Sequence, residues 1–456
     1  MKTQTVTRLS HRSEPRLILF FAGWGMDARP FATLGREGYD TAVVWDYADP
    51  TPIPADFLDA YREICVVGWS FGVPYAARFI AAEEKRRPIT RCVAVNGTLN
   101  PVDDSHGIPR AIFEGTLNGL TERTLDKFNR RMAGSAEAAK AFAATAPRRS
   151  IADLTEELKR VDADGEAPRV AFDSVYISGA DRIIPPRNQR NAWEGLAPIT
   201  DLGPEGPHLP DFAFILSRET ADKSRIGSSF ESAGATYDSE AAIQHEVAQH
   251  LAELWHSGTP LPHGDIIEFG TGTGQLTRIL AADRPMRLYD IAPVSAAVKR
   301  ADAEIMIGQM IAERPTAGVI AASTIQWFNS PRRFIGRALR AMPPGSRLAL
   351  STFGPDTYRE LAPFQQSRPA YMSADELREI ASALAAEGVV EPDFTVEAGP
   401  VRVMEFGTTR RLAEHIRLSG VNATRLNGTA AARALLAAAP TKLTYAPVYI
   451  MLRRRR

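Results

Sequence analysis

The chain has 456 residues, of which 44% are apolar and 32 are proline, and this describes globular material longer than one ordinary hydrophobic core. Its 54 Lys and Arg residues balance its 54 Asp and Glu residues, so no net field draws the whole protein to nucleic acid or to an anionic membrane. No apolar run approaches the roughly 18 residues that cross a membrane, and residues 1–15 lack the apolar centre of a signal peptide. Cys65 and Cys92 lie in apolar runs that suit buried thiols. We therefore expect a cytoplasmic protein of two domains.

Short apolar runs alternate with helical patterns in the first quarter of the chain. The runs at 17–21, 42–45, 64–67 and 92–95 predict buried strands, and the stretches 57–62 and 74–85 have helical periodicity. This alternation predicts a parallel sheet with helices packed on its faces.

The third predicted strand runs into Gly68-Trp69-Ser70-Phe71-Gly72, the G-x-S-x-G pattern of a nucleophile elbow. The glycines are needed because side chains beside the sharp turn between strand and helix would clash. A glycine-rich turn follows the first strand, and in an α/β-hydrolase that loop supplies one backbone N–H of the oxyanion hole. The predicted donors are the amide of Trp24 or of its neighbour and the amide of Phe71.

Strand signals stop between about 109 and 169, where helix-forming stretches take over, as expected for a helical cap over a hydrolase site. Several arginines of this cap could meet an acidic partner, the alternative being ordinary solvated helix faces: Arg123, Arg130, Arg131, Arg148 and Arg149.

The sheet resumes at 175–177, and Asp181 lies in the turn that follows it. An acid after a late strand and then a loop histidine, His208, give the chain order Ser…Asp…His of α/β-hydrolases. Ser70 would attack a carbonyl, His208 would take and return its proton, and Asp181 would hold the useful imidazole tautomer. His106 is the rival base, although it precedes the acid, and a hydrolase fold with an inactive site is the alternative for all three residues.

Five segments of this half extend beyond a general hydrolase pattern: 21–27 (FAGWGMD), 68–73 (GWSFGV), 96–98 (NGT), 103–109 (DDSHGIP) and 112–117 (IFEGTL). Together they resemble the BioG family of pimeloyl-acyl-carrier-protein methyl ester esterases. The resemblance covers about residues 1–220 and implies an α/β-hydrolase domain with esterase activity.

Small residues accumulate and periodicity lapses at 224–235, so we predict a linker at 221–236 and a second domain at 237–456. That domain should open on an amphipathic helix over 237–255. The histidines of this region, His245, His250, His256 and His263, have no carboxylate or cysteine that completes a ligand set, so no metal is expected.

A strand at 265–269 ends in the glycine-rich loop Gly270-Thr271-Gly272-Thr273-Gly274, and Asp290 closes the next strand. Glycines let the backbone approach a cofactor, and an acid one strand later can bind ribose hydroxyls. The leading Glu268 and the absence of G-x-x-G spacing favour S-adenosylmethionine over a dinucleotide, because no pyrophosphate needs the helix N-terminus. A Rossmann-like dehydrogenase is the alternative.

Further strands are predicted at 319–322 and 347–354. These strands and the segments around 237–244, 351–358, 418–423 and 443–445 resemble the BioC family of malonyl-acyl-carrier-protein methyltransferases, over about residues 222–456. The resemblance implies that Glu268, Gly270, Thr271, Gly272, Gly274 and Asp290 bind S-adenosylmethionine. Where the family has Gly-Asp near the adenine, this chain has Gly308-Gln309, so Gln309 is the predicted adenine contact.

The predicted protein is thus an α/β-hydrolase with a helical cap fused to a Rossmann-like methyltransferase. The two resemblances imply that one domain masks the carboxylate of malonyl-acyl carrier protein as a methyl ester, and that the other removes the mask at the pimeloyl stage of biotin synthesis. The acyl carrier protein is the expected partner. Two alternatives stay open: a general carboxylesterase fused to a small-molecule methyltransferase, and a protein in which one domain is an inactive scaffold that docks the carrier.

Overall fold

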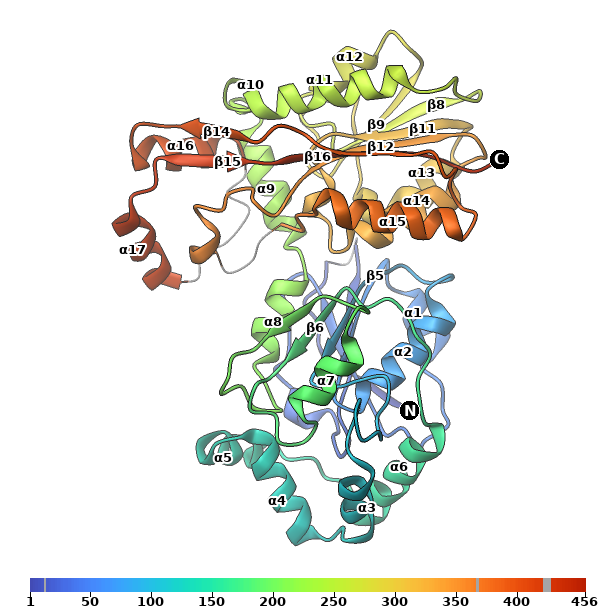
Figure 1. The fold of residues 1–456 in the computed structure, drawn as a ribbon, viewed down its shortest axis with the longest axis vertical. Coiled ribbons are helices and arrows are strands. Elements are labelled where there is room, and N and C mark those ends of the chain that lie inside the picture. The colour runs from blue at the N-terminus through green and yellow to red at the C-terminus, as the bar shows by residue number, and fades with distance from the viewer. Residues whose placement is uncertain (12–13, 366–368, 421–427) are drawn as a thin grey trace. The chain divides into compact units, whose positions relative to one another are not determined.

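The computed structural model describes residues 1–456 except 12–13, 366–368 and 421–427, and divides the chain into two compact units, Met1–Thr220 and Ala221–Arg456. Each unit is built on its own seven-stranded sheet (Figure 1). Among the residues that the structure describes, no helix is long and apolar enough to cross a membrane. The predicted fold class, two α/β domains of hydrolase and Rossmann-like type, is confirmed.

The sheet of the first unit has the strand order β1-β3-β2-β4-β5-β6-β7, with β1 antiparallel at one edge and the other strands parallel. Its strands are β1 (Lys2–Thr7), β2 (Arg16–Phe21), β3 (Asp40–Trp45), β4 (Glu63–Trp69), β5 (Ile89–Val95), β6 (Ser174–Ile177) and β7 (Ile199–Asp201). Its α-helices are α1 (Ala55–Asp59), α2 (Gly72–Glu83), α3 (Arg110–Asn118), α4 (Glu122–Ala133), α5 (Ala136–Ala144), α6 (Ile151–Asp164), α7 (Pro186–Trp193) and α8 (Phe212–Glu219).

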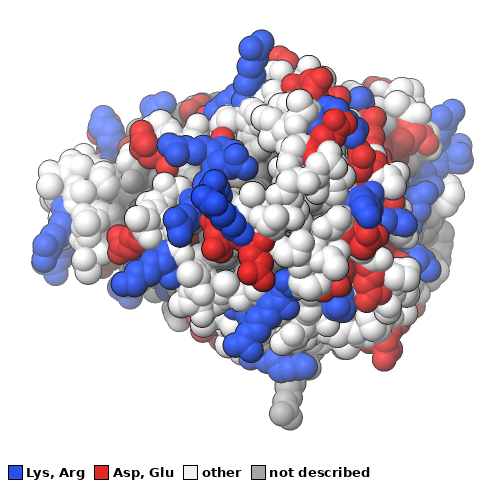
Figure 2. Space-filling view, turned by 90° about the horizontal axis from the view of Figure 1, so that it is seen from below, with Lys and Arg blue, Asp and Glu red and all other residues white. Residues whose placement is uncertain are grey.

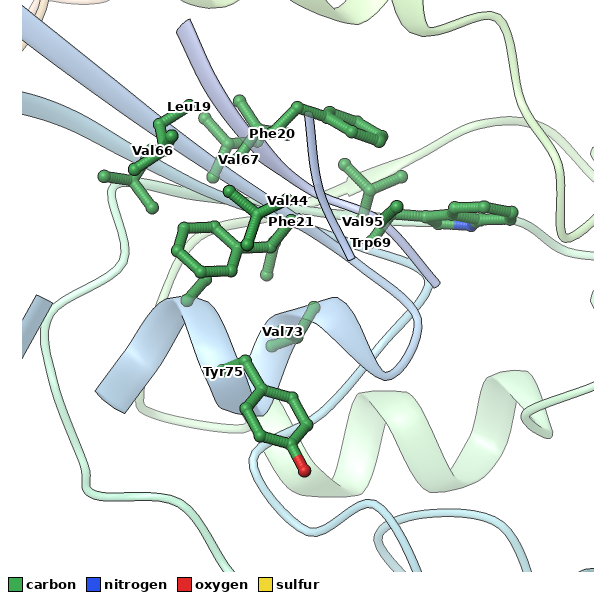
Figure 3. Close-up of a cluster of buried hydrophobic side chains, with 14 of the residues drawn as sticks. Leu19, Phe20, Phe21, Val44, Val66, Val67, Trp69, Val73, Tyr75 and Val95 are labelled. Carbon is green, nitrogen blue, oxygen red and sulfur yellow. The ribbon is translucent and has the colours of Figure 1, made fainter. Parts of the chain in front are cut away.

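The central strands β2 and β4 are fully buried because helices cover both faces of the sheet, which explains their continuous apolar sequence. In Figure 3 the side chains of Phe21 and Val44 lie between the strands and Val73 of α2. On the opposite face Phe20 packs edge-on against Phe212 of α8, with ring centroids 4.9 Å apart. The two cysteines are buried free thiols. This core fixes the end of β4, where the elbow begins.

Helices α3, α4, α5 and α6 gather at one end of the first unit (Figure 1). They occupy the range 109–169 in which strand signals stop. Side-chain hydroxyls cap three of them, because Thr121, Ser135 and Ser150 each accept a hydrogen bond from a backbone N–H of the first turn.

The second sheet has the order β10-β9-β8-β11-β12-β16-β13, parallel from β10 to β12, with β16 antiparallel to both of its neighbours. Its strands are β8 (Asp265–Phe269), β9 (Met286–Asp290), β10 (Lys299–Arg300), β11 (Thr316–Ala321), β12 (Arg347–Phe353), β13 (Thr395–Ala398) and β16 (Pro447–Arg453), and β14 (Arg402–Glu405) pairs with β15 (Lys442–Tyr445) separately. The helices are α9 (Lys223–Ala233), α10 (Tyr237–Glu240), α11 (Ala242–Ser257), α12 (Gln275–Leu280), α13 (Ala303–Ala312), α14 (Pro331–Ala341), α15 (Ala374–Ala386), α16 (Thr409–Leu418) and α17 (Gly428–Ala438).

Two apolar clusters sandwich this sheet, one beneath α11 and α12 and the other beneath α13, α14 and α15 (Figure 1). The stretch 221–236, which we predicted to be a linker, belongs to the second compact unit, and most of it forms helix α9. Asp222 caps this helix by accepting a hydrogen bond from the Arg225 N–H, and Ile226 is buried. Small residues such as Gly227 and Ser228 interrupt the helical spacing of apolar residues, so the sequence did not predict this helix. A helix that packs closely against its own unit does not need a wide apolar stripe.

Candidate active sites

Ser70 sits at a sharp turn between β4 and α2, with a φ of +56° that non-glycine residues rarely adopt. The surrounding chain leaves no room for a side chain at either of the nearby glycines, Gly68 and Gly72. A Cβ on Gly72 would lie 2.0 Å from the Phe21 carbonyl oxygen, and one on Gly68 would lie 2.8 Å from the Val73 Cα. The G-x-S-x-G spacing therefore lifts the Ser70 hydroxyl out of the end of the sheet.

A chain of hydrogen bonds joins Ser70, His208 and Asp181. The His208 Nε2 lies 2.9 Å from the Ser70 Oγ, and its Nδ1 lies 2.8 Å from an Asp181 carboxylate oxygen. All three residues are buried. The Asp181 carboxylate also accepts hydrogen bonds from the Ile183 and Ile184 amides and from Gln189. These donors orient the carboxylate, so that its remaining contact is with the imidazole.

The rival histidine, His106, lies on an exposed loop where its ring contacts Asp103 instead of Ser70. Two residues that sequence reasoning missed hold His208 in place. Trp69 Nε1 and Asn96 Nδ2 each donate to the His208 carbonyl oxygen, at 2.9 and 3.0 Å. Asn96 follows β5 directly. A polar residue at the carboxyl end of a central strand often belongs to a site, and this position could have identified Asn96 from the sequence.

A mainly apolar pocket opens above Ser70 beneath the helical cap. It is lined by Trp24, Ser70, Phe71, Ile108, Ile112, Phe113, Thr116, Phe128, Arg131, Leu158 and Ile183. Both residues expected to form the oxyanion hole, Trp24 and Phe71, are at its wall. The amide of Gly25, the neighbour of Trp24, is already bound by Glu157, which leaves the Trp24 amide as the candidate donor in that loop.

Glu157 of α6 ties the cap to the loop that carries Trp24. Its fully buried carboxylate accepts hydrogen bonds from the amides of Gly25, at 3.3 Å, and Tyr47, at 3.1 Å. It also pairs with Arg149, which bridges to Asp46. Burial raises the pKa of Glu157, while Arg149 opposes that rise. The sequence left open whether Arg149 meets an acidic partner or lies on a solvated helix face. Neither holds, because its side chain is 6% exposed and pairs with Asp46 and Glu157.

The other candidate basic residues remain on the surface. Arg123, Arg130 and Arg148 are exposed, and Arg131 is exposed at the pocket wall with its guanidinium over the Phe128 ring. Figure 2 views the molecule from the side of the cap helices and shows Lys and Arg in several groups interspersed with Asp and Glu. An acidic partner would therefore meet separate basic points rather than a uniform field.

In the second unit the loop between β8 and α12 is held by three glycines with positive φ: Gly270, Gly272 and Gly274. A Cβ on Gly270 would lie 2.2 Å from the Thr324 hydroxyl oxygen, whereas the Cβ position of Gly272 faces open space. The backbone at Gly272 is therefore open to a bound molecule. Its N–H donates to Asp290 at 2.8 Å, so the acid at the end of β9 fixes the loop.

Beside this loop lies a cavity lined by Gly270, Gly272 and Asp290 and by apolar side chains from several elements, including Phe269, Ile291 and Phe328. A smaller hollow continues along Glu268, Gly270, Thr271 and Gly272. Burial raises the pKa of Glu268 to about 7, against the hydrogen bond that it accepts from Thr277. An apolar cleft with carboxylates at its edge suits a ligand that combines an aromatic ring, hydroxyls and a cationic group.

The predicted adenine contact, Gln309, does not reach this cavity. It is exposed on α13, two turns after the N-cap, and the residue at the cavity wall is Asp302. Asp302 caps α13 by accepting a hydrogen bond from the Glu304 N–H. The position of Asp302 between a short strand and a helix is the feature of the sequence from which it could have been predicted. Lys223 of α9 also lines the cavity and contacts Glu304 at 2.8 Å.

Within the part of the chain that the structure describes, no three His, Cys, Asp or Glu side chains lie close enough to hold a metal ion. Of the histidines near the start of the second unit, His250 contacts Glu253 and Glu397, and His256 contacts Asp283.

Comparison with known proteins assigns both halves. Residues 1–216 match the family described as pimeloyl-ACP methyl esterase BioG, and residues 239–389 match a methyltransferase domain family. The malonyl-acyl-carrier-protein O-methyltransferase of Bacteroides fragilis (strain 638R) is 31% identical over 96% of this chain and 93% of its own length. The biotin biosynthesis bifunctional protein BioHC of Teredinibacter turnerae is 24% identical over 82% of this chain and 78% of its own.

Among solved structures, BioG from Haemophilus influenzae is 33% identical and covers 44% of this chain and 92% of its own, with a TM-score of 0.40. The two resemblances drawn from the sequence are confirmed by the family matches and by the full-length relative. The chain therefore belongs to the family of malonyl-acyl-carrier-protein O-methyltransferases, in the fused form whose N-terminal half is a BioG-type esterase domain.

Proposed function

We propose that this chain is a bifunctional enzyme of biotin synthesis. Its second unit methylates the free carboxylate of malonyl-acyl carrier protein with S-adenosylmethionine, and its first unit hydrolyses pimeloyl-acyl-carrier-protein methyl ester to the pimeloyl carrier and methanol. Because these substrates and S-adenosylmethionine belong to the cytoplasm, this function implies that location. The observation that carries the proposal is the hydrogen-bonded line Ser70–His208–Asp181 beneath an apolar pocket, in a chain that also holds a glycine-loop cavity.

In the esterase reaction Ser70 attacks the ester carbonyl while His208 accepts its proton and later returns it to the leaving methoxide. Asp181 keeps the proton of the imidazole on Nδ1 and stabilises the charged ring. The amides of Trp24 and Phe71 are proposed to bind the oxyanion that forms in the tetrahedral intermediate. Water then repeats the attack on the acyl-enzyme.

The apolar pocket also explains how one chain could install and remove methyl groups without a futile cycle. A pimeloyl ester has four more methylene groups than a malonyl ester, and each buried methylene contributes about 0.8 kcal/mol, which gives about 3 kcal/mol or roughly 200-fold in favour of the longer ester. In addition, we propose that the short ester does not extend from the carrier's arm as far as Ser70. Equal hydrolysis of the two methyl esters on the carrier would refute both explanations.

The second site fits S-adenosylmethionine, which when bound supplies an electrophilic methyl group on a sulfonium. We propose that Asp290 binds the ribose hydroxyls, that Glu268 lies on the side of the cationic amino group with Thr271, and that Asp302 lies near the adenine. The open Cβ position of Gly272 lets the backbone approach closely. A carboxylate needs no general base to attack a sulfonium, so these residues contribute mainly by positioning.

The acyl carrier protein is the proposed macromolecular partner. Exposed arginines on α4 complement the acidic surface expected of a carrier. Arg123→Glu and Arg130→Glu should each weaken carrier binding to the esterase, whereas unchanged affinity would remove these two residues from the proposal. Glu156→Gln, on an exposed part of α6, serves as a matched surface control.

Mass spectrometry of pimeloyl-acyl-carrier-protein methyl ester tests the esterase. The ester is incubated with the wild type and with Ser70→Ala, without S-adenosylmethionine. Release of methanol by the wild type alone supports the proposal, and release by neither or by both contradicts it. In parallel, wild type and Asp290→Asn are given malonyl carrier and S-adenosylmethionine, and the added methyl mass should appear with the wild type and be strongly reduced with the variant.

A further inference from the structure

A third hollow adjoins the cofactor cavity in the second unit, and nothing described so far uses it. It is lined by residues of α10, α11 and the loop after β12. Tyr237 and Ser323 line all three spaces: this hollow, the cofactor cavity and the hollow along Glu268. Gln244 of α11 lines the two smaller hollows. These three side chains therefore stand where the compartments meet.

Two buried oxygen atoms at this junction have no hydrogen-bond partner among the described residues. They are the Oε1 atom of Gln244, whose side chain is almost fully buried, and the Oγ atom of Ser323. Leaving a buried polar group unpaired is unfavourable, so such groups are rare unless a ligand or water satisfies them. A carboxylate can only accept hydrogen bonds. The oxygen and nitrogen of the Gln244 amide exchange places when the group turns by 180°, so this site can present an N–H donor, and the Ser323 hydroxyl can donate as well.

The backbone at Ser323 is strained as well, with a φ of +52° two residues after the end of β11. The strain is held in place by Ser351, which accepts a hydrogen bond from the Ser323 N–H at 3.0 Å, and by Gln326, which donates to the Ser323 carbonyl oxygen. A non-glycine residue in this conformation is unfavourable, and such residues cluster at functional sites. The unpaired hydroxyl is thus held in a fixed place.

Among the residues that the structure describes, none that lines the third hollow is charged. Its lining consists of aromatic rings and of neutral polar groups, among them Tyr237, Gln244, Ser323, Gln326 and Thr357. Burial raises the pKa of Tyr237, so its phenol keeps its proton at neutral pH. Neutral donors can orient a carboxylate without the strong pairing that a Lys or Arg would impose, and the carboxylate then stays a competent nucleophile.

From this juxtaposition we infer that the third hollow binds the methyl acceptor, and that Gln244 and Ser323 hydrogen-bond its carboxylate beside the transferable methyl group. The inference rests on the proposed methyltransferase function and adds to it the acceptor site and the neutral character of the contacts. In the reaction a carboxylate oxygen forms a bond to the methyl carbon as the C–S bond breaks. The sulfur keeps that electron pair, so no proton has to move.

The test uses the full chain with Gln244→Leu, Gln244→Glu and Ser323→Ala, and Gln249→Leu as a control on the exposed face of the same helix. A hydrogen bond to a charged group contributes about 1.5–3 kcal/mol, so each of Gln244→Leu and Ser323→Ala should lower kcat/KM for malonyl carrier by about 10- to 100-fold. Gln244→Glu should lower it further by charge repulsion. Gln249→Leu should leave it unchanged.

Binding of S-adenosylhomocysteine, measured by calorimetry, separates the outcomes. The inference predicts an affinity within about threefold of the wild type for every variant, which also shows that the second unit is folded. If Gln244→Leu or Ser323→Ala loses cofactor affinity as much as methyl transfer, the groups serve the cofactor and the inference is wrong. Unchanged methyl transfer in both variants also overturns it. A wild type that binds S-adenosylhomocysteine but does not methylate malonyl carrier would instead refute the proposed function.

Discussion

Replacing Glu157 with glutamine tests whether the cap positions the oxyanion loop. The substitution keeps the shape but removes the charge that Arg149 faces and one of the two oxygens that bind the amides of Gly25 and Tyr47. Breaking a buried ion pair by removing one partner costs about 3–5 kcal/mol. An orphaned backbone N–H adds about 1–3 kcal/mol.

Three features moderate that sum. Arg149 keeps its contact with Asp46, the glutamine oxygen can still accept one amide, and burial already penalises the ionised form of Glu157. We therefore expect the free energy of unfolding of the first unit to fall by about 3 kcal/mol, near the lower end of the buried-pair range. We also expect kcat for the pimeloyl ester to fall by at least about tenfold, below the 10²–10³ that follows complete loss of an oxyanion donor.

Urea unfolding of the full chain with and without S-adenosylhomocysteine provides the assay. The ligand should shift only the transition of the second unit, which identifies the transition of the first unit. Glu157→Gln should lower that first transition alone. The matched control is Glu156→Gln on the same helix, because Glu156 pairs with Lys159 on the surface, where an ion pair contributes under about 1 kcal/mol. An unchanged transition together with an unchanged kcat in Glu157→Gln would refute the reasoning.

Three further predictions follow from the two sites. Asp181→Asn should reduce kcat of the esterase by about 10⁴-fold with little change in KM, because it favours the wrong imidazole tautomer, and steady-state kinetics checks this. Gly72→Ala should prevent folding of the elbow, since its Cβ would lie 2.0 Å from the Phe21 oxygen; esterase activity should be lost and the near-ultraviolet circular dichroism should fall by the share of the first unit. The rise in the pKa of Glu268 from 4.5 to about 7 means that the folded state holds this proton more tightly, so stability is lost as pH rises between those values. At pH 8 Glu268→Gln should therefore be more stable than the wild type without cofactor by about 3 kcal/mol, and the difference should vanish near pH 4.5; equal pH profiles would contradict it.

The sequence allowed the first site to be predicted because its signals are local. The elbow consists of five consecutive residues, and Ser70, Asp181 and His208 follow one another along the chain in the order that the α/β-hydrolase fold requires. The contacts of Glu157 with Gly25 and Tyr47 join residues more than a hundred positions apart, and nothing local marks them.

In the second unit the glycine loop and Asp290 were predictable for the same reason, since they lie at the ends of adjacent parallel strands. Gln309 was predicted as the adenine contact because Gly308-Gln309 was matched to the Gly-Asp pair of the family. The residue at the wall of the cavity is Asp302, which its N-cap position identifies. Helix α9 was missed because its small residues carry little periodicity, although Lys223 from it lines the cavity. The third hollow is assembled from α10, α11 and the segments after β11 and β12, so no contiguous sequence motif marks it.

The central claim is that one chain both installs and removes a methyl ester, and a single reaction mixture tests it. The full-length protein is incubated with malonyl carrier, methyl-labelled S-adenosylmethionine and unlabelled pimeloyl-carrier methyl ester, and each carrier species is followed by mass spectrometry. The account predicts that labelled malonyl methyl ester accumulates while the pimeloyl ester is converted to the free acid. Loss of both esters at similar rates, or no label on the malonyl carrier and an intact pimeloyl ester, would contradict it.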